Sequence, residues 1–284
     1  MEPWQVKEIV LKALKEDLPF GDKTTEMLIP SNFYGKAYFL AKSSLVICGE
    51  PIAEAVYKEI DPEVKITWHY PEGSEIKSFT KFGYVEGKVQ SLLKGERVAL
   101  NFLQHLSGIA TKVREMVHKL KNSALLLDTR KTLPGLKILQ KYAVKIGGGK
   151  NHRFSLSDGI LIKDNHIKAL GGLEKTLNKI KEIPHYLKVE IEIKSLKELN
   201  LLLESNAKVD IVLLDNFSLE DLKKAITLIK SKKPALEIEV SGGISEENLE
   251  NYKELDINYI SSGALTHSVK AVDISFKIEE IWEI

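Results

Sequence analysis

Hydrophobic positions follow two different patterns along the chain, and the pattern changes near residue 124. Before that point, apolar residues three or four positions apart predict helices over residues 4–15 and 95–120. Short β-type runs separated by turn residues lie between Gly35 and Leu93. This mixture predicts a small α+β domain over residues 1–107. The β-type runs include Ala37–Leu40, Val64–Trp68 and Tyr84–Leu93.

After residue 124, six short apolar runs each end in a polar residue or glycine, and helix-type segments separate them. Strands that alternate with helices predict a parallel sheet, either open or closed into a barrel. The first loop has no G-x-G-x-x-G sequence, and polar residues end almost every strand, which favours a barrel. The runs number two fewer than the eight strands of a complete barrel. They are Leu125–Leu127, Ile160–Ile162, Val189–Ile193, Ile211–Leu214, Leu236–Val240 and Tyr259–Ile260.

The ends of these strands carry the candidate chemistry, because reaction sites of β/α barrels lie at the carboxyl ends of the strands. A polar residue at one strand end is ordinary surface, but six consecutive polar ends indicate a site. The candidates are Thr129-Arg130-Lys131, Lys163, Glu192, Asp215, Ser241-Gly242-Gly243 and Ser262-Gly263.

Two of the strands alternate apolar and acidic residues, at 189–193 and 236–240. Strands of a parallel sheet are usually buried on both faces and apolar throughout, so these carboxylates must face a polar interior or cations. We expect Glu190, Glu237 and Glu239 to form salt bridges inside the barrel. Glu192 and Asp215 are better placed to face a ligand, and with substrate phosphates they could hold Mg²⁺.

Charge is sorted along the chain. Lys and Arg total 41 and Asp and Glu total 40, but residues 129–168 carry nine basic and two acidic residues, a net +7. We expect Lys137, Lys141 and Lys145, four residues apart, to form a solvated helix face. Another group lies at strand ends or in a glycine-rich loop, where guanidinium and ammonium groups suit a small polyanionic ligand. This group is Arg130, Lys131, His152, Arg153 and Lys163.

Two glycine-containing loops predict a phosphate site. Ser241-Gly242-Gly243 and Ser262-Gly263 end neighbouring strands, and glycine lets backbone N–H groups approach an anion. Ser245 is expected to cap a helix that begins at Glu246, which would add a favourable dipole. The loops after the last two strands of a barrel are a frequent phosphate site.

Composition excludes several classes of protein. The 284 residues include one cysteine, Cys48, so an internal disulfide framework and multi-cysteine metal sites are excluded. A net charge of +1 argues against a general nucleic-acid or membrane-surface binder. No secretory signal and no run of eighteen apolar residues is present, so we expect a cytoplasmic protein without membrane helices.

Eight stretches resemble, in order, the quinolinate phosphoribosyltransferase family, the nicotinate-nucleotide pyrophosphorylases that release carboxylate as CO₂. The resemblance spans nearly the whole chain and its motifs are long and specific. The stretches are Glu16–Thr25, Glu96–Thr111, Asp128–Leu136, Gly147–Arg153, Leu161–His166, Val189–Glu192, Leu214–Asn216 and Ser241–Ile244.

The resemblance implies an N-terminal α/β sandwich and a C-terminal, incomplete β/α barrel. We therefore divide the chain at residues 1–107, 108–270 and 271–284, and expect the last segment to pack on the N-terminal domain. It also implies a homodimer in which Arg97 of one subunit completes the site of the other, and it leaves further assembly into a hexamer open.

The implied reaction joins quinolinate to 5-phosphoribosyl-1-pyrophosphate and gives nicotinate mononucleotide, pyrophosphate and CO₂ for NAD biosynthesis. Lys131, Glu192 and Asp215 are the candidate catalytic residues, with Mg²⁺ as cofactor on the two acids. Lys131 would neutralise pyrophosphate. The two carboxylates of quinolinate would contact Arg97, Arg130, His152, Arg153 and Lys163, with Thr129 beside them. The 5-phosphate would be held by Ser241, Gly242, Gly243, Ser262, Gly263 and Ala264.

Three alternatives stay open at this stage. A molybdenum-uptake-associated relative shares the fold but departs near Leu161–His166, so the presence of Lys163 favours the biosynthetic enzyme. Nicotinate phosphoribosyltransferase, which does not decarboxylate, has different motifs. A non-catalytic polyanion-binding barrel would place its cations on exposed helices among aromatic residues. Here the cations lie at strand ends beside carboxylates.

Overall fold

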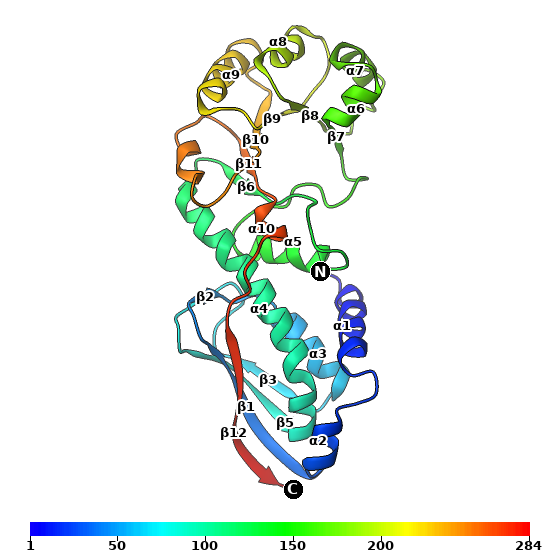
Figure 1. Ribbon diagram of the computed structural model, residues 1–284, viewed down its shortest axis with the longest axis vertical. Helices are drawn as coiled ribbons and strands as arrows, with labels where there is room; N and C mark the ends of the chain where they lie inside the picture. Colours follow the sequence, from blue (N-terminus) through cyan, green and yellow to red (C-terminus); the bar gives the residue numbers. More distant parts are fainter. The chain divides into compact units, whose positions relative to one another are not determined.

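The computed structural model describes residues 1–284 and divides the chain into two compact units. The first unit comprises residues 1–114, 132–148 and 265–284, and the second comprises residues 115–131 and 149–264. Figure 1 labels the elements of both units. Each unit has its own sheet, so each is described separately.

An antiparallel sheet forms the centre of the first unit, with the strand order β12-β1-β5-β3. Helices α3 and α4 lie along this sheet (Figure 1). The elements that lie wholly within the unit, with β2 and β4 as a separate pair, are α1 (Pro3–Asp17), α2 (Lys23–Leu28), β1 (Phe33–Ala41), β2 (Leu45–Val46), α3 (Glu50–Ile60), β3 (Lys65–Trp68), β4 (Glu75–Ile76), β5 (Lys81–Lys88), α5 (Lys137–Ile146) and β12 (Ile274–Glu283).

Aromatic side chains join the sheet to its helices. Phe39 of β1 stacks on Trp68 of β3 and on Phe82 of β5, with ring centroids 5.4 and 5.9 Å apart. Phe276 of β12 contacts the edge of Phe39 and stacks on Tyr57 of α3. These rings bury large apolar areas, so the residues of β12 complete the core of a sheet that begins near the N-terminus.

Helix α4 spans Val89–Leu120 and begins earlier than the sequence indicated. The β-type run Tyr84–Leu93 ends as strand β5 at Lys88, and the prediction of a helix start at residue 95 was wrong. Val89 and Leu92 are buried one helical turn apart. Gly95 lies within this helix. A Cβ there would lie 2.5 Å from the Tyr57 ring, so the absence of a side chain permits the close packing of α4 against Tyr57.

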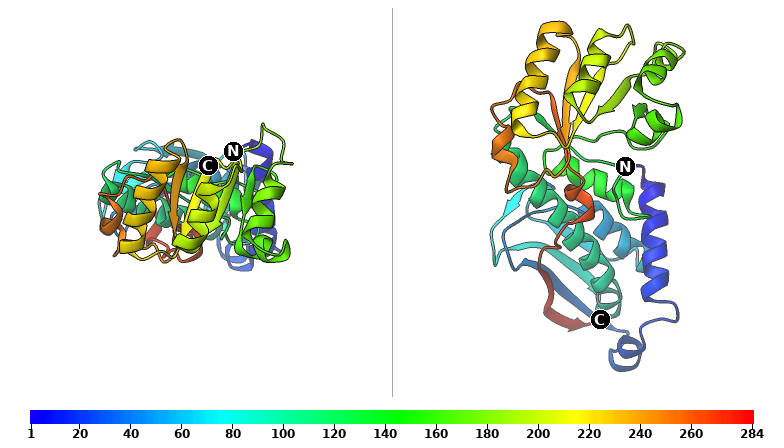
Figure 2. Two further views of the ribbon diagram at one scale, coloured as in Figure 1. Left: turned by 90° about the horizontal axis from the view of Figure 1, so that it is seen from above. Right: turned by 45° about the horizontal axis from the view of Figure 1, so that its top comes forward.

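The second unit contains six parallel strands in the order β6-β11-β10-β9-β8-β7. Each strand from β7 to β10 pairs with the next one along the chain, and β11 pairs with β6, which confirms the predicted barrel-like β/α architecture with six strands. Figure 2 shows the helices that follow β7, β8 and β9. Besides the end of α4, the elements are β6 (Leu125–Leu127), β7 (Ile160–Ile162), α6 (Asp164–Ala169), α7 (Leu173–Ile180), β8 (Val189–Ile193), α8 (Leu196–Glu204), β9 (Ile211–Asp215), α9 (Leu219–Lys232), β10 (Glu237–Ser241), η1 (Leu249–Tyr252) and β11 (Tyr259–Ser261); α10 (Ala264–His267) follows.

Strands β6 and β7 form the two edges of this sheet. The segment around Lys150 extends the β6 edge, because Leu127 and Lys150 form an isolated parallel bridge. The glycine-rich segment before β7 is therefore held against the sheet by backbone hydrogen bonds. No helix of the structure combines the length and the apolar character that a bilayer crossing requires.

The amino end of α3 is held by a carboxylate from a distant loop. Glu72 accepts hydrogen bonds from the N–H groups of Gly49 and Glu50, at 2.7 and 3.0 Å, and from the Tyr142 hydroxyl at 2.9 Å. Burial, and then the nearby carboxylates of Glu72 and Glu54, raise the pKa of the buried Glu50 to about 8.

The first prediction concerns the pH dependence of stability. Because the pKa of Glu50 is higher in the folded chain than its ordinary 4.5, its stabilising contribution is complete below pH 4.5 and is lost as the pH rises through about 8. We expect Glu50→Gln to match the wild type in thermal unfolding at pH 5 and to unfold at a higher temperature, by about 2 °C or more, at pH 9. A difference in Tm that is the same at both pH values would contradict this assignment.

Candidate active site

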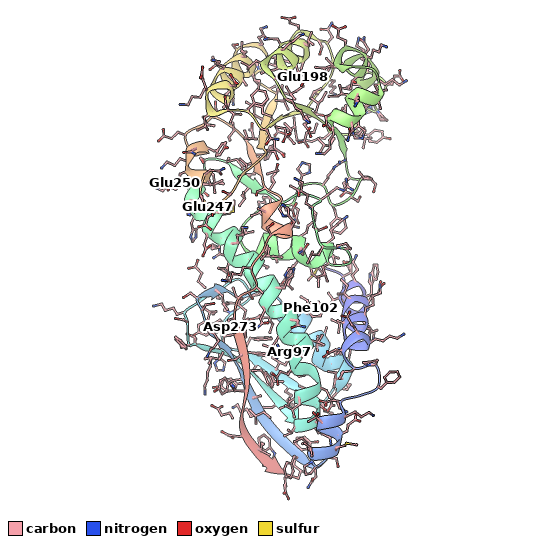
Figure 3. All side chains as sticks on the ribbon, in the orientation of Figure 1. Arg97, Phe102, Glu198, Glu247, Glu250 and Asp273 are labelled. Atoms are coloured by element: carbon pink, nitrogen blue, oxygen red, sulfur yellow. The ribbon has the colours of Figure 1, made fainter.

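The structure gathers most of the predicted site residues at the carboxyl ends of strands in the second unit. Thr129, Arg130 and Lys131 follow β6, Lys163 follows β7, and Glu192 lies in β8. Asp215 and Ser241 end β9 and β10, with Gly242 and Gly243 after them, and Ser262, Gly263 and Ala264 follow β11. Arg97 lies on α4 in the first unit, where its side chain is exposed (Figure 3).

Two lysines contact the Glu192 carboxylate. The Nζ atom of Lys163 lies 3.2 Å from Glu192 Oε2, and Nζ of Lys194 lies 3.6 Å from Oε1. Lys194 also forms an ion pair with Asp164 at 2.6 Å, and the hydrogen bond to Asp164 raises the pKa of Lys194. Only 7% of the Glu192 side chain is exposed, so this buried carboxylate is compensated by two half-exposed cations.

Lys194 is a residue that the sequence analysis missed. It directly follows strand β8, so the same strand-end rule that selected Lys163 could have found it. Asp215 also acts electrostatically on Lys194. The ammonium group therefore lies among three carboxylates, those of Asp164, Glu192 and Asp215. These oxygen donors are also the type that Mg²⁺ prefers, so the residues present fit the predicted metal site.

Two asparagines hold the glycine loop after β10. The backbone N–H of Asn216 donates to Ser241 O at 2.9 Å, and the side-chain Nδ2 of Asn248 donates to Gly243 O at 2.7 Å. Gly242 and Gly243 have φ values of +100° and +61°, which L side chains rarely adopt. The loop thus has the backbone freedom that the predicted phosphate site requires.

The helix expected at this loop is absent at that position. Ser245 does not cap a helix at Glu246, because residues 246–248 form turns and the next helical segment is the short 3₁₀ helix η1, which begins at Leu249. The Ser245 N–H instead donates to Asn248 Oδ1 at 3.0 Å, a local contact that holds the turn and does not cap a helix. A phosphate at this loop would depend on glycine N–H groups rather than on a helix dipole.

The loop that carries His152 and Arg153 is anchored on a fully buried carboxylate. Asp128 accepts hydrogen bonds from Asn151 Nδ2 at 2.6 Å and from the His152 N–H at 2.9 Å. Burial, and then the charge of Arg130, lower the pKa of Arg153, whereas Glu190 and Asp158 act in the opposite direction. Two guanidinium groups therefore lie close enough to repel each other, as expected where a dianion binds between them.

Burial contradicts part of the predicted solvated lysine face. Lys145 is exposed, but Lys141 is only 2% exposed, so its assignment to a solvated face was wrong. Helix α5 is covered on a broad face that includes Leu139, Gln140 and Ala143, and Lys141 falls within that face. A spacing of four residues indicates a common side of a helix but does not tell which side is covered.

The carboxylates of β8 and β10 form ion pairs, but the pair of Glu237 lies outside the expected interior, because the side chains of Lys188 and Glu237 are 67% and 31% exposed. Glu237 lies 3.1 Å from Lys188 Nζ, and Glu190 lies 3.0 Å from His152 Nε2, with Glu239 at 3.6 Å from the same nitrogen. His152, Glu190 and Glu239 also line a cavity of about 320 Å³ inside the second unit. Glu190 and Glu239 thus point into a polar interior, as the alternation predicted.

Comparison with known proteins gives one consistent family. A family profile described as "Quinolinate phosphoribosyl transferase, C-terminal domain" matches residues 109–277, and the corresponding N-terminal profile matches residues 22–107. The chain is 42% identical to a probable carboxylating nicotinate-nucleotide pyrophosphorylase of Methanocaldococcus jannaschii, over 95% of this chain and 96% of the relative. It is 40% identical to quinolinate phosphoribosyltransferase [decarboxylating] 1b of Nicotiana tabacum, over 97% and 83%.

Solved structures agree with these relatives. The nicotinate-nucleotide pyrophosphorylase of Francisella tularensis superimposes with a TM-score of 0.91 at 36% identity, over 98% of both chains. Human nicotinic acid phosphoribosyltransferase shares only the fold, with a TM-score of 0.59 and 12% identity. The similarity therefore covers both units and is strongest for the decarboxylating enzymes.

The second prediction tests the geometry of the glycine loop. A Cβ at Gly242 would lie 2.3 Å from Asn216 Oδ1 and 2.7 Å from Asn216 N, whereas nothing lies within 4 Å of a Cβ at Gly243. We expect Gly243→Ala to lower the free energy of unfolding by about 1 kcal/mol, because of its positive φ alone, and Gly242→Ala to lower it by at least about twice as much. Urea unfolding of both variants measures this, and equal losses would show that the contact with Asn216 is unimportant.

Proposed function

The chain belongs to the quinolinate phosphoribosyltransferase family, and we propose from this premise which of its residues perform each part of the family's reaction. The enzyme transfers a phosphoribosyl group from 5-phosphoribosyl-1-pyrophosphate to quinolinate, and the product loses CO₂ to give nicotinate mononucleotide for NAD biosynthesis. The observation that carries the residue assignment is geometric: the buried Asp128 carboxylate, two residues before Arg130, holds the loop of His152 and Arg153 through Asn151 Nδ2 and the His152 N–H.

Quinolinate is a planar pyridine with two adjacent carboxylates. A pair of guanidinium groups suits it because each presents a planar fork of N–H donors to a carboxylate. Arg130 and Arg153 supply these forks, and Lys163 and His152 add positive charge or hydrogen-bond donors beside them. Binding the dianion would also relieve the repulsion between the two arginines, which makes the substrate part of the charge balance of the site.

The phosphoribosyl donor needs separate contacts for its 5-phosphate and its pyrophosphate. The loops Ser241–Gly243 and Ser262–Ala264 offer backbone N–H groups to the 5-phosphate. Lys131 neutralises charge on the pyrophosphate. Glu192 and Asp215 accept hydrogen bonds from the ribose hydroxyls or hold Mg²⁺, which would supply positive charge to the leaving pyrophosphate.

In the transfer step the pyridine nitrogen forms a bond to C1 of the ribose as the C1–O bond to pyrophosphate breaks, and the electron pair of that bond leaves with pyrophosphate. Positive charge develops on the ribose during this step. The carboxylates of Glu192 and Asp215 stabilise it, while Lys131 stabilises the negative charge on the leaving group.

In the second step the bond between C2 of the ring and its carboxylate breaks. CO₂ leaves and the electron pair stays on C2, beside the positively charged ring nitrogen, until a proton replaces it. Cations around the ring, above all Arg153 and Lys163, stabilise this negative charge in a site from which water is excluded.

Arg97 belongs to this proposal through a second copy of the chain. Its exposed position on α4 leaves the guanidinium available to a partner, and we propose a homodimer in which it completes the partner's quinolinate site. Assembly of dimers into a hexamer is compatible with this arrangement. A cytoplasmic location is also proposed, supported by Cys48, a single buried cysteine in the chain.

The third prediction tests the roles of the two most specific cations. We expect Lys131→Ala and Arg153→Ala to lose about 100-fold or more in turnover, because each removes a charge that stabilises the transition state. Thermal unfolding should stay near the wild-type temperature, because Lys131 is exposed and Arg153 is half-buried. Pyrophosphate release measures turnover, and wild-type rates in both variants would reject the assignment.

The fourth prediction tests the shared site. Arg97→Ala and Lys131→Ala should each be inactive alone, but a mixed dimer should contain one intact site. Co-refolding equal amounts is expected to restore about a quarter of wild-type activity, because half of the dimers are mixed and each has one working site of two. If Arg97 served its own subunit, every site would carry a defect and the mixture would stay inactive.

A further inference from the structure

Below the strand-end residues, three side chains meet inside the barrel of the second unit. Nε2 of His152 lies 3.0 Å from Oε2 of Glu190 and 3.6 Å from Oε2 of Glu239. The exposed fractions of the Glu190 and Glu239 side chains are 6% and 1%. Glu190 belongs to β8 and Glu239 to β10, and β9 lies between them in the sheet (Figure 1).

The second ring nitrogen of His152 fixes which atom carries the proton. The Arg153 N–H donates to His152 Nδ1 at 2.7 Å, so Nδ1 acts as an acceptor. In a neutral imidazole the proton must then be on Nε2, which faces the Glu190 carboxylate at 3.0 Å, while Glu239 at 3.6 Å acts through its charge. Both ring nitrogens are therefore engaged with the protein, and the ring links the interior acids to the backbone of Arg153.

A metal ion is the obvious alternative occupant, because a histidine and two carboxylates within 4.8 Å of one another are a possible ligand set. Coordination through Nε2 would force the imidazole proton onto Nδ1. That proton would face the Arg153 N–H across 2.7 Å, where two donors repel. The observed geometry favours a hydrogen-bonded cluster over a metal site.

Charge explains why the two acids tolerate each other. Burial, and then the charge of Glu190, raise the pKa of Glu239 to about 7. At neutral pH a proton on Glu239 thus reduces the repulsion within the pair. Glu190 acts electrostatically on Arg153, whose pKa it raises, so its negative charge supports a cation of the quinolinate site.

We propose that Glu190 and Glu239 are positioning residues: by holding the His152 ring, they orient Arg153 toward the carboxylates of quinolinate. The inference rests on the proposed function and adds two residues that do not touch the substrate. A role in stability alone does not explain these acids, because replacing a whole buried ionic cluster by apolar residues often leaves the stability of a protein unchanged or raises it. Parallel strands are also normally apolar at such positions.

The test compares two substitutions at Glu190. Glu190→Leu removes the nearer acceptor of Nε2, so we expect KM for quinolinate to rise about tenfold while KM for the phosphoribosyl donor stays unchanged. The Tm should fall, because only one member of a buried polar cluster is replaced. Glu190→Gln keeps an oxygen that accepts from Nε2, and it should restore most of the affinity. The matched control is Glu237→Gln on the same face of β10, where Glu237 pairs with Lys188 and Tyr259 and not with His152.

A double variant separates positioning from general damage. If Glu190 acts through the imidazole, Glu190→Leu combined with His152→Phe should raise KM no more than His152→Phe alone. The proposal would be overturned if the two substitutions raised KM for quinolinate by independent factors that multiply in the double variant, or if Glu190→Leu left KM unchanged. So would tight binding of Zn²⁺ by calorimetry that His152→Phe abolishes, because the cluster would then be a metal site.

The two levels of inference fail in different ways. A wild-type protein without turnover of quinolinate rejects the proposed function itself. An active wild type with a Glu190→Leu variant of unchanged KM rejects only the positioning role. Direct calorimetric titration of quinolinate into wild type and Glu190→Leu checks the same difference in affinity without relying on turnover.

Discussion

Compensation of buried charge inside a parallel barrel is the constraint on which the rest of the second unit depends. The inner faces of β8 and β10 carry carboxylates where such strands are usually apolar. Buried carboxylates are costly unless cations or hydrogen-bond donors lie beside them. His152 lies beside Glu190 and Glu239 in the interior, and Lys163 pairs with Glu192 near the strand ends. Lys188 pairs with the more exposed Glu237.

The same constraint explains the net charge of +7 over residues 129–168. Part of this charge lies away from the candidate site, because Lys141 of α5 is buried in the first unit. The remainder lies in loops held by acids, with Asp128 beneath His152 and Glu192 beside Lys163. Acids position the cations, which in the proposed function meet a substrate with two carboxylates and a donor with phosphates. The near-neutral total hides a site whose positive charge is arranged for anions.

Sequence patterns predicted the barrel well because each apolar run ends in a polar residue or glycine, and all six runs became strands. They failed where tertiary contacts decide. The helix expected from residue 95 begins at Val89, and Lys141 looked solvated but lies on the covered side of α5. Ser245 was expected to cap a helix at Glu246, but residues 246–248 form turns. The strand-end rule could have found Lys194, whereas the ring orientation of His152 depends on distances that no linear pattern contains.

The most direct test of this account follows the carboxylate that the reaction removes. Purified protein is incubated with quinolinate labelled isotopically at its 2-carboxylate, together with 5-phosphoribosyl-1-pyrophosphate and Mg²⁺. The account predicts labelled CO₂ and nicotinate mononucleotide in equal amounts, and neither product when the phosphoribosyl donor is omitted. Absence of both products from the complete mixture, or nicotinate mononucleotide formed from nicotinate in place of quinolinate, would contradict it.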